Sequence, residues 1–291
     1  MLLYLIIIAA TIAVICIIIE IYRELNTFRV VTYEINSPKI KGIKNPIRIV
    51  FLSDLHNHMY KPGNEPLINS IKETNPDLVL IGGDMLVGKR DKSYQTAVSF
   101  MKEISKSYPV YYANGNHEQR AKEEPENYRW SYKEYKEELE NAGVIFLENA
   151  STDFLFENFR INITGLEIPG YAYTHFKRVQ VSSEEIEERI GRPEKQVYQI
   201  LLAHNPIYME KYIEWGADLI LSGHLHGGIV RIPGITGLIT PAFRLFPKYS
   251  GEHRKEGDTD IVVSKGLGVH TVYIRFLNPA EVVLLNIKSE D

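Results

Sequence analysis

Short apolar runs alternate with amphipathic segments along much of this chain. The runs at 47–52 and 77–81 are rich in Ile, Val and Leu, as buried strands are, whereas 64–75 places apolar residues at helical spacing. The alternation continues with a predicted helix over 93–106 and a predicted strand over 109–113. Such a pattern is typical of parallel βαβ units, in which functional loops gather beyond the carboxyl ends of the strands.

The second half of the chain predicts a second sheet. Its apolar runs are short and spaced as strands are, at 144–147, 159–165, 197–203, 217–221, 260–264 and 281–287. Residues 227–257 are rich in Gly and Pro and predict a loop that is long for a compact domain. Loops of that length are usually functional, so we expect this one at the rim of a site.

The amino-terminal run from Leu2 to Ile19 has no charged side chain. A helix needs about 20 apolar residues to cross the hydrocarbon of a bilayer, so this run is just long enough. No Lys or Arg precedes it, unlike a cleavable signal peptide, and Ile15 stands before Cys16 where a lipoprotein signal needs a small residue. Nothing polar punctuates it as in a core helix, so we expect a retained anchor.

These features divide the chain into three parts. We expect residues 1–22 to be a single-pass transmembrane anchor in the cell membrane, 23–46 a juxtamembrane strand and turn, and 47–291 the catalytic domain. Arg23 and Arg29 lie on the carboxyl side of the anchor, which favours a cytoplasmic position for the soluble domain.

Composition narrows the possible partners. Hydrophobic residues make up 44% of the chain and charged residues 24%, as in folded proteins. The formal net charge of −4 argues against general binding of nucleic acid, because such proteins usually carry a basic excess. The single cysteine excludes an intrachain disulfide and a Cys-rich zinc module. No nucleic acid is expected as a partner, and the oligomeric state is left open.

Asp, Asn and His side chains directly follow several of the apolar runs. An isolated acid at the end of a strand is usually a turn residue or a helix cap. Here several such positions occur together, and their shared feature is a ligand-type side chain after a strand: Asp54, His56, Asp84, Asn116, His117, His204, His224 and His226. This repetition favours a metal site over a set of unrelated turns.

The types of side chain favour particular metals. Hard cations take carboxylate and amide oxygens, whereas Mn, Fe and Zn also accept imidazole. Apart from His117, the set has two Asp, one Asn and four His, which are too many ligands for one tetrahedral site and suit two divalent ions such as Mn, Fe or Zn better than Mg. Two-metal centres hold their ions about 3.5–4 Å apart, so one carboxylate should bridge them, and Asp84 is the natural bridge.

The order of these side chains along the sequence resembles the motif order of the calcineurin-like metallophosphoesterase superfamily. The match runs from residue 53 to 226. Carried over, the resemblance implies one metal held by Asp54, His56, Asp84 and His226. It implies a second metal held by Asp84, Asn116, His204 and His224. His117 matches the family's catalytic histidine, which lies over the metals without binding them.

Within the superfamily, the chain looks like the small membrane-associated bacterial phosphoesterases of the YkuE/YaeI kind. The resemblance rests on the apolar anchor, the Gly-rich block after His226 and the ending from Lys265 to Val282. Ile229 stands where that group usually has Gln, so the polar contact of that side chain is not carried over. The anchor also lacks the twin arginine of exported relatives.

We therefore expect an α/β fold, a four-layer sandwich of two mixed β-sheets flanked by helices and preceded by a transmembrane helix. The expected activity is hydrolysis of a phosphomonoester or phosphodiester by a metal-activated hydroxide. A lipid-linked substrate is slightly favoured, and the candidate substrate contacts are Arg231, Arg244, Lys248 and His253. The alternatives are a soluble nucleotide or small phosphodiester as substrate, and a catalytically inactive metal-binding scaffold.

Overall fold

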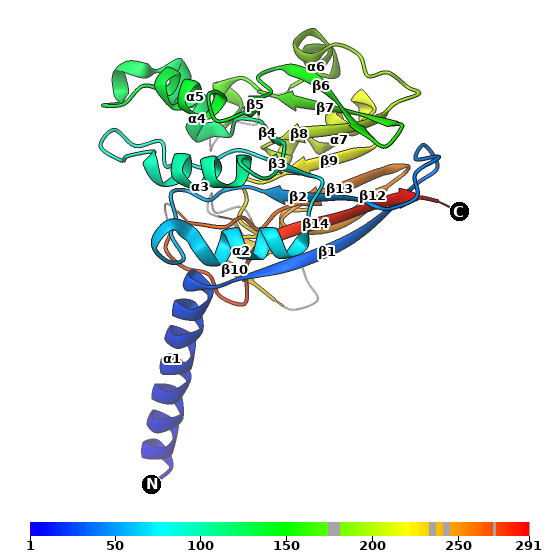
Figure 1. The fold of residues 1–291 in the computed structure, drawn as a ribbon. Helices are drawn as coiled ribbons and strands as arrows, with labels where there is room; N and C mark the ends of the chain where they lie inside the picture. Colours follow the sequence, from blue (N-terminus) through cyan, green and yellow to red (C-terminus); the bar gives the residue numbers. More distant parts are fainter. Residues whose placement is uncertain (174–180, 233–236, 241–244, 270–271, 291) are drawn as a thin grey trace.

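Two mixed β-sheets lie face to face between helices, and each has six strands in the described part of the chain (Figure 1). This arrangement confirms the predicted four-layer α/β sandwich. The computed structural model describes residues 1–173, 181–232, 237–240, 245–269 and 272–290.

The first sheet contains the strands nearest the amino terminus and the last strand of the chain. Its order is β1 (Phe28–Ser37), β14 (Ala280–Ser289), β2 (Ile47–Leu52), β3 (Leu78–Ile81), β4 (Val110–Tyr112) and β5 (Val144–Phe146). Only β14 and β2 run antiparallel. Its outer face packs against α2 (Glu65–Thr74), α3 (Gln95–Ser105) and α5 (Tyr132–Glu140).

The second sheet has antiparallel strands at both edges. Its order is β12 (Glu252–Glu256), β13 (Thr259–Val263), β9 (Leu219–Ser222), β8 (Tyr198–Ala203), β7 (Phe159–Leu166) and β6 (Ala150–Phe156). The pairs β12/β13 and β6/β7 are antiparallel, and the remaining pairs are parallel. Its outer face packs against α6 (Ser183–Ile190) and α7 (Met209–Trp215).

The strand β2 shows why its sequence is apolar throughout. Val50 and Leu52 belong to the core beneath the helices, whereas Ile49 and Phe51 belong to the core between the two sheets. Successive side chains of a strand point to opposite faces, and here both faces are covered. A continuous apolar run is therefore what a central strand of this sandwich requires.

The region 227–257, predicted as one long loop, contains short strands. The hairpin of β10 (Val230–Arg231) and β11 (Gly237–Ile239) forms a small separate sheet, and β12 joins the second large sheet. The Gly and Pro residues of this region favour a loop, and each of these strands is only two to five residues long, too short to give a clear pattern.

The helix α1 (Leu2–Asn26) projects from the domain and leaves its apolar side chains exposed (Figure 1). It is long and apolar enough to cross a membrane, as an anchor or a signal sequence would be. The chain continues into β1, which pairs in parallel with β14 from Phe28 opposite Ala280 onward. The strand expected next to the anchor is thus an edge strand of the first sheet, and the three-part division of the chain stays a prediction.

Candidate metal centre

The loops after β2, β3, β4, β8 and β9 meet at one edge of the two sheets. Their Asp and His side chains form three overlapping groups, within each of which the ligand atoms lie within 4.8 Å of one another. The groups are Asp54, His56 and His226; His56, Asp84 and His117; and Asp84, His204 and His224. Side chains separated by up to 172 positions in the sequence (226 − 54) therefore share one cluster.

The backbone at this cluster is strained. A left-handed φ is found at several of the residues that carry ligand-type side chains: Asp54 (55°), His56 (49°), Asp84 (55°), His224 (71°) and His226 (52°). For residues other than Gly such a conformation costs on the order of 1 kcal/mol or more each, and it persists where the surroundings impose it. These left-handed conformations orient the side chains into the cluster.

Two glycines allow the loops to approach one another. A Cβ atom at Gly115 would lie 2.2 Å from Asp84 Oδ1, and one at Gly223 would lie 2.3 Å from Asp54 Oδ2. Any larger residue would displace a carboxylate of the cluster. Gly115 precedes α4 (Asn116–Glu123), so this close approach brings Asn116 and His117 to the site on the first turn of a helix.

In three histidines the ring nitrogen Nδ1 is hydrogen-bonded to a backbone carbonyl oxygen. Nδ1 of His56 lies 3.3 Å from the carbonyl oxygen of Leu86, that of His204 lies 2.6 Å from Gly82 O, and that of His226 lies 3.0 Å from Gly268 O. A carbonyl oxygen can only accept, so each Nδ1 carries the proton. The Nε2 lone pairs are then left for the cluster, which is the usual arrangement of metal-binding histidine.

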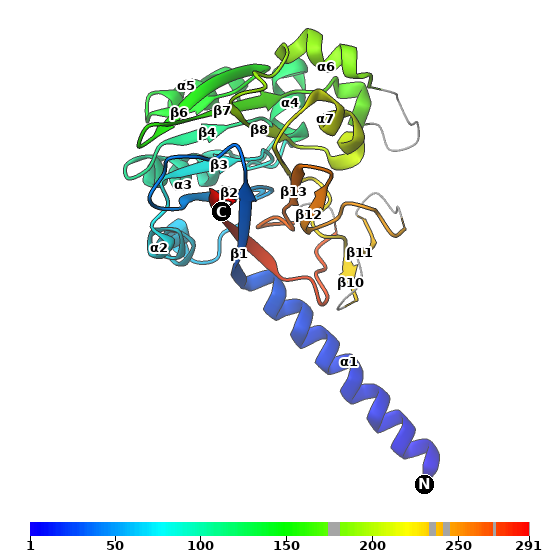
Figure 2. The ribbon, with the colours of Figure 1, turned by 90° about the vertical axis from the view of Figure 1, so that its right-hand side faces the viewer.

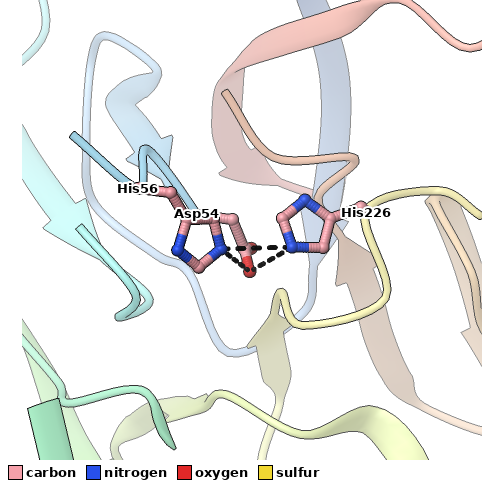
Figure 3. Close-up of side chains that lie close together, drawn as sticks. All are labelled: Asp54, His56 and His226. Atoms are coloured by element: carbon pink, nitrogen blue, oxygen red, sulfur yellow. Dashed lines mark hydrogen bonds and ion pairs between the residues drawn. The ribbon is translucent and has the colours of Figure 1, made fainter. Parts of the chain in front are cut away.

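Ring nitrogens and a carboxylate oxygen, all of them hydrogen-bond acceptors, face each other in the cluster. Nε2 of His56 lies 3.2 Å from Nε2 of His226, and Asp54 Oδ1 lies 3.4 Å from the latter. Figure 3 shows these three side chains pointing toward one another. Burial and the neighbouring charge of Asp84 raise the pKa of Asp54 to about 6, against the influence of His204. Such a concentration of lone pairs is what a bound cation would stabilise.

A second close approach of this kind joins His204 and Asp84. His204 Nε2 lies 3.1 Å from Asp84 Oδ2. Burial disfavours the charged imidazolium, but the carboxylates of Asp84 and Asp54 outweigh burial and raise the pKa of His204 to about 10. The Asp84 carboxylate thus faces this ring nitrogen at a place where a divalent ion would compensate its charge. Asn116 Oδ1 is buried and has no hydrogen-bond partner among the described residues. The donor set therefore fits two divalent metals.

The family of the chain follows from its sequence match. Residues 47–228 match the model of the calcineurin-like phosphoesterase family. The chain belongs to this family. It is thus a metal-dependent phosphoesterase with its His and Asp ligand cluster intact, and the predicted superfamily is confirmed.

Three bacterial relatives are similar over most of their lengths. The uncharacterized metallophosphoesterase YkuE of Bacillus subtilis is 24% identical, covering 92% of this chain and 88% of the relative. An uncharacterized metallophosphoesterase of Aquifex aeolicus is 27% identical, with coverage of 95% and 98%. The phosphodiesterase YaeI of Escherichia coli is 25% identical, with coverage of 77% and 76%. The chain is thus a distant homologue of YkuE and YaeI.

In this phosphoesterase, His117 differs from the other histidines of the cluster. Its Nδ1 accepts a hydrogen bond of 2.9 Å from the backbone N–H of Gly88, so in the neutral ring the proton is on Nε2. That Nε2 lies 4.0 Å from Asp84 Oδ2, and the backbone N–H of His117 donates to Asp84 Oδ1 at 2.8 Å. His117 can therefore present a hydrogen-bond donor to the cluster.

Glu118 is a residue of the site whose role the sequence analysis did not identify. Its buried carboxylate accepts hydrogen bonds from the backbone N–H groups of Asp84 (2.9 Å), Met85 (2.8 Å) and Gly115 (3.0 Å) and from the hydroxyl of Tyr112 (2.8 Å). Burial and the charge of Asp84 raise the pKa of Glu118 to about 7. Its position directly after the Asn116 and His117 pair was the available signal.

We expect Glu118→Gln to lower the free energy of unfolding by about 2 kcal/mol, because the new amide group turns a donor toward backbone donors that now bond to a carboxylate. Thermal unfolding of the metal-free protein measures this loss. Glu137→Gln, which alters a half-exposed side chain paired with Lys133, should have almost no effect. Equal unfolding temperatures for the two variants would contradict a structural role for Glu118.

The candidate substrate contacts have other partners in the structure. Arg231 is buried, its guanidinium donates to Gly227 O at 3.0 Å, and it forms an ion pair with Glu252. Lys248 pairs with Glu256 at 3.2 Å, and His253 Nε2 lies 2.6 Å from Asp260 Oδ1. None of these three belongs to the ligand clusters of the described residues. Arg244 lies outside the described residues.

A pocket of about 400 Å³ opens beside the cluster, between α4, the turn η3 (Gly170–Tyr173) and α6. Its lining includes Asn116, Arg120, Tyr173 and Arg189. The Tyr173 ring packs edge-on against His224, with 5.4 Å between centroids. Arg189 Nε is buried without a hydrogen-bond partner among the described residues. The pocket thus offers cationic and aromatic groups next to Asn116, together with the carboxylates of Glu123 and Glu124, and sequence patterns did not indicate it.

Proposed function

We propose that this phosphoesterase uses two divalent metals to hydrolyse a phosphate diester whose leaving group or headgroup lies near a membrane. The observation that carries the proposal is the convergence of two buried carboxylates and the unprotonated Nε2 atoms of several histidines on one cluster. The proposed ligands are Asp54, His56, Asp84 and His226 for one metal, and Asp84, Asn116, His204 and His224 for the other. Mn, Fe and Zn suit these ligands better than Mg.

When bound, the two metals would supply a hydroxide nucleophile at neutral pH and neutralise charge on the phosphoryl oxygens. The protein positions the groups around that chemistry. Asp84 and Asp54 hold fixed negative charges in a buried site, and Glu118 holds the Asp84 loop. His117 keeps a proton at Nε2, where it can stabilise the phosphoryl group and protonate the leaving alkoxide.

The substrate class follows from two features of the chain. The similarity to YaeI, which is named a phosphodiesterase, favours a diester over a monoester. The apolar helix α1, used as an anchor, would keep the site close to lipid headgroups, so we favour a lipid-linked phosphodiester. In this proposal the pocket at Arg120 and Arg189 takes a polar, anionic or hydroxyl-bearing part of the substrate. The protein would be a single-pass protein of the cell membrane with its domain on the cytoplasmic side.

Purified full-length protein tests this proposal. We expect about two equivalents of Mn, Fe or Zn by mass spectrometry, hydrolysis of bis-(p-nitrophenyl) phosphate, and loss of hydrolysis after chelation that Mn²⁺ restores. Protein without metal and without activity in added Mn²⁺ would instead be the inactive scaffold. Turnover of extracted membrane lipids compared with turnover of nucleotides then separates a lipid-linked substrate from a soluble one.

A further inference from the structure

Large apolar side chains are exposed together on one side of the domain. They come from the β10–β11 region and from the segment before β14: Ile232 (41%), Leu245 (65%), Phe246 (62%), Tyr273 (66%), Ile274 (41%) and Leu277 (41%). We call these six residues the apolar rim. Single exposed apolar residues are ordinary, but a group of them indicates a contact surface.

The rim is one continuous structure. Val230 pairs with Phe276 on one side and with Ile239 on the other, and Ile239 pairs with Leu245. The backbone N–H of Phe246 donates to Leu238 O at 3.1 Å. The segments that carry the six side chains are therefore neighbours held in register by backbone bonds.

The rim adjoins the base of α1. Glu24, in the last turn of that helix, is buried and accepts a hydrogen bond of 2.8 Å from the backbone N–H of Asn278. Asn278 directly follows Leu277 of the rim. Figure 2 shows β10 and β11 on the side of the domain from which α1 leaves. The exposed apolar side chains thus begin one residue from a fixed contact with the apolar helix.

Two members of the rim have strained backbones. Phe246 has a φ of 46° and Leu277 a φ of 55°, which are rare values for bulky residues. Both side chains are nevertheless exposed, so burial in the domain core does not explain the strain. Strain of this kind concentrates at binding surfaces, where a contact outside the domain can offset it.

We propose that the apolar rim contacts the lipid bilayer beside α1, so that the domain rests on the membrane at two places. This proposal relies on α1 being the membrane anchor proposed above. Leu, Ile and Phe side chains enter the boundary between headgroups and acyl chains, and Tyr places its hydroxyl among the headgroups. The hydrogen bond of Glu24 fixes the rim at the level where the helix leaves the membrane.

The same segment supports the metal cluster from inside. Between the exposed Ile274 and Leu277, the buried Arg275 donates to Gly268 O at 2.9 Å, and Gly268 O holds Nδ1 of His226. The Asn278 side chain donates to His226 O at 2.7 Å. Contact of the rim with lipid would thus place the His226 side of the cluster next to the bilayer surface, where phosphate headgroups are found.

A fluorescence experiment on the full chain tests the rim. The native Cys16 is the single cysteine and lies within α1, so wild type labelled with an environment-sensitive dye reports on the anchor. In a Cys16→Ser background, Tyr273→Cys and Phe246→Cys report on the rim. Leu155→Cys is the control, because Leu155 is 69% exposed and belongs to β6, a strand on the side of the domain away from α1 (Figure 1). All are reconstituted in phosphatidylethanolamine and phosphatidylglycerol vesicles containing a doxyl-labelled lipid.

We expect the doxyl lipid to quench the dye at positions 16, 273 and 246 and to leave position 155 unchanged. Quenching at position 16 without quenching at 273 and 246 would overturn the rim contact and leave the anchor intact. Absence of quenching at position 16 would overturn the anchor and the rim contact with it. Quenching at 155 equal to that at 273 would also overturn the proposal, because the contact would not be specific to the rim.

Discussion

Asp84→Asn is expected to lower the turnover of a phosphodiester by about a thousandfold, because Asp84 is the proposed ligand of both metals and several kcal/mol of charge neutralisation would depend on it. About 4 kcal/mol in the activation barrier corresponds to this factor. The metal content should fall below two equivalents in the same preparation. Turnover of bis-(p-nitrophenyl) phosphate and mass spectrometry of bound metal measure the two effects.

The structure predicts that this variant still folds. Asp84 Oδ1 accepts the backbone N–H of His117 at 2.8 Å, and an Asn oxygen can do the same. The Asn amide nitrogen would then face His204 Nε2, which lies 3.1 Å from Asp84 Oδ2, and could donate to it. The new amide thus occupies the position that a cation would take. We expect the metal-free variant to unfold near the wild-type temperature and to gain little stability from added Mn²⁺.

Asp153→Asn provides the matched control for Asp84→Asn. Asp153 lies on the surface strand β6 and pairs with the half-exposed Arg160, so its change should leave metal content and turnover as in wild type. A fully active Asp84→Asn protein that retains two metals would contradict the bridging role. In that case the proposed mechanism would have to place the two metals on separate ligand sets.

Much of the fold could be predicted because its central strands are apolar on both faces. The runs around Ile49 and Leu80 have this property, and the residues directly after them are those that the parallel strands bring together. The sequence order of Asp54, Asp84 and His204 therefore indicated a cluster before any geometry was known. Residues that directly follow parallel strands lie at the same edge of the sheet, so their positions in the sequence predict that they are close in space.

Other features depend on contacts that no local pattern encodes. The pairing of β1 with β14 joins residues 252 positions apart, from Phe28 to Ala280 (280 − 28). The bonds of Glu118 to backbone N–H groups depend on how two loops meet. The apolar rim is similar, since the segments that contain Leu245 and Phe276 are joined only through the β10–β11 hairpin. Such tertiary contacts determine both the support of the site and its surroundings.

His117→Ala is expected to keep the metals and to lower turnover by a factor of about 10² to 10⁴, the usual contribution of a positioned proton donor. The loss should appear in kcat, because the Nε2 proton acts on the phosphoryl group or the leaving alkoxide in the transition state. Metal analysis and steady-state kinetics on one preparation separate this result from the loss of a ligand. A drop in metal content along with activity would make His117 a ligand instead.

The conservative variant His117→Asn tests whether turnover depends on the Nε2 proton of His117 or on its hydrogen bond to the loop at Gly88. The Nδ1 atom of His117 accepts the backbone N–H of Gly88, and the oxygen of Asn can reach the same donor from nearly the same place. Asn therefore keeps the loop contact and lacks the distant Nε2 atom that lies 4.0 Å from Asp84 Oδ2. If the role of His117 is proton donation, His117→Asn should be as slow as His117→Ala although its loop is intact. Recovery of wild-type turnover in His117→Asn would show that His117 only holds Gly88, and that the leaving alkoxide takes its proton from another group.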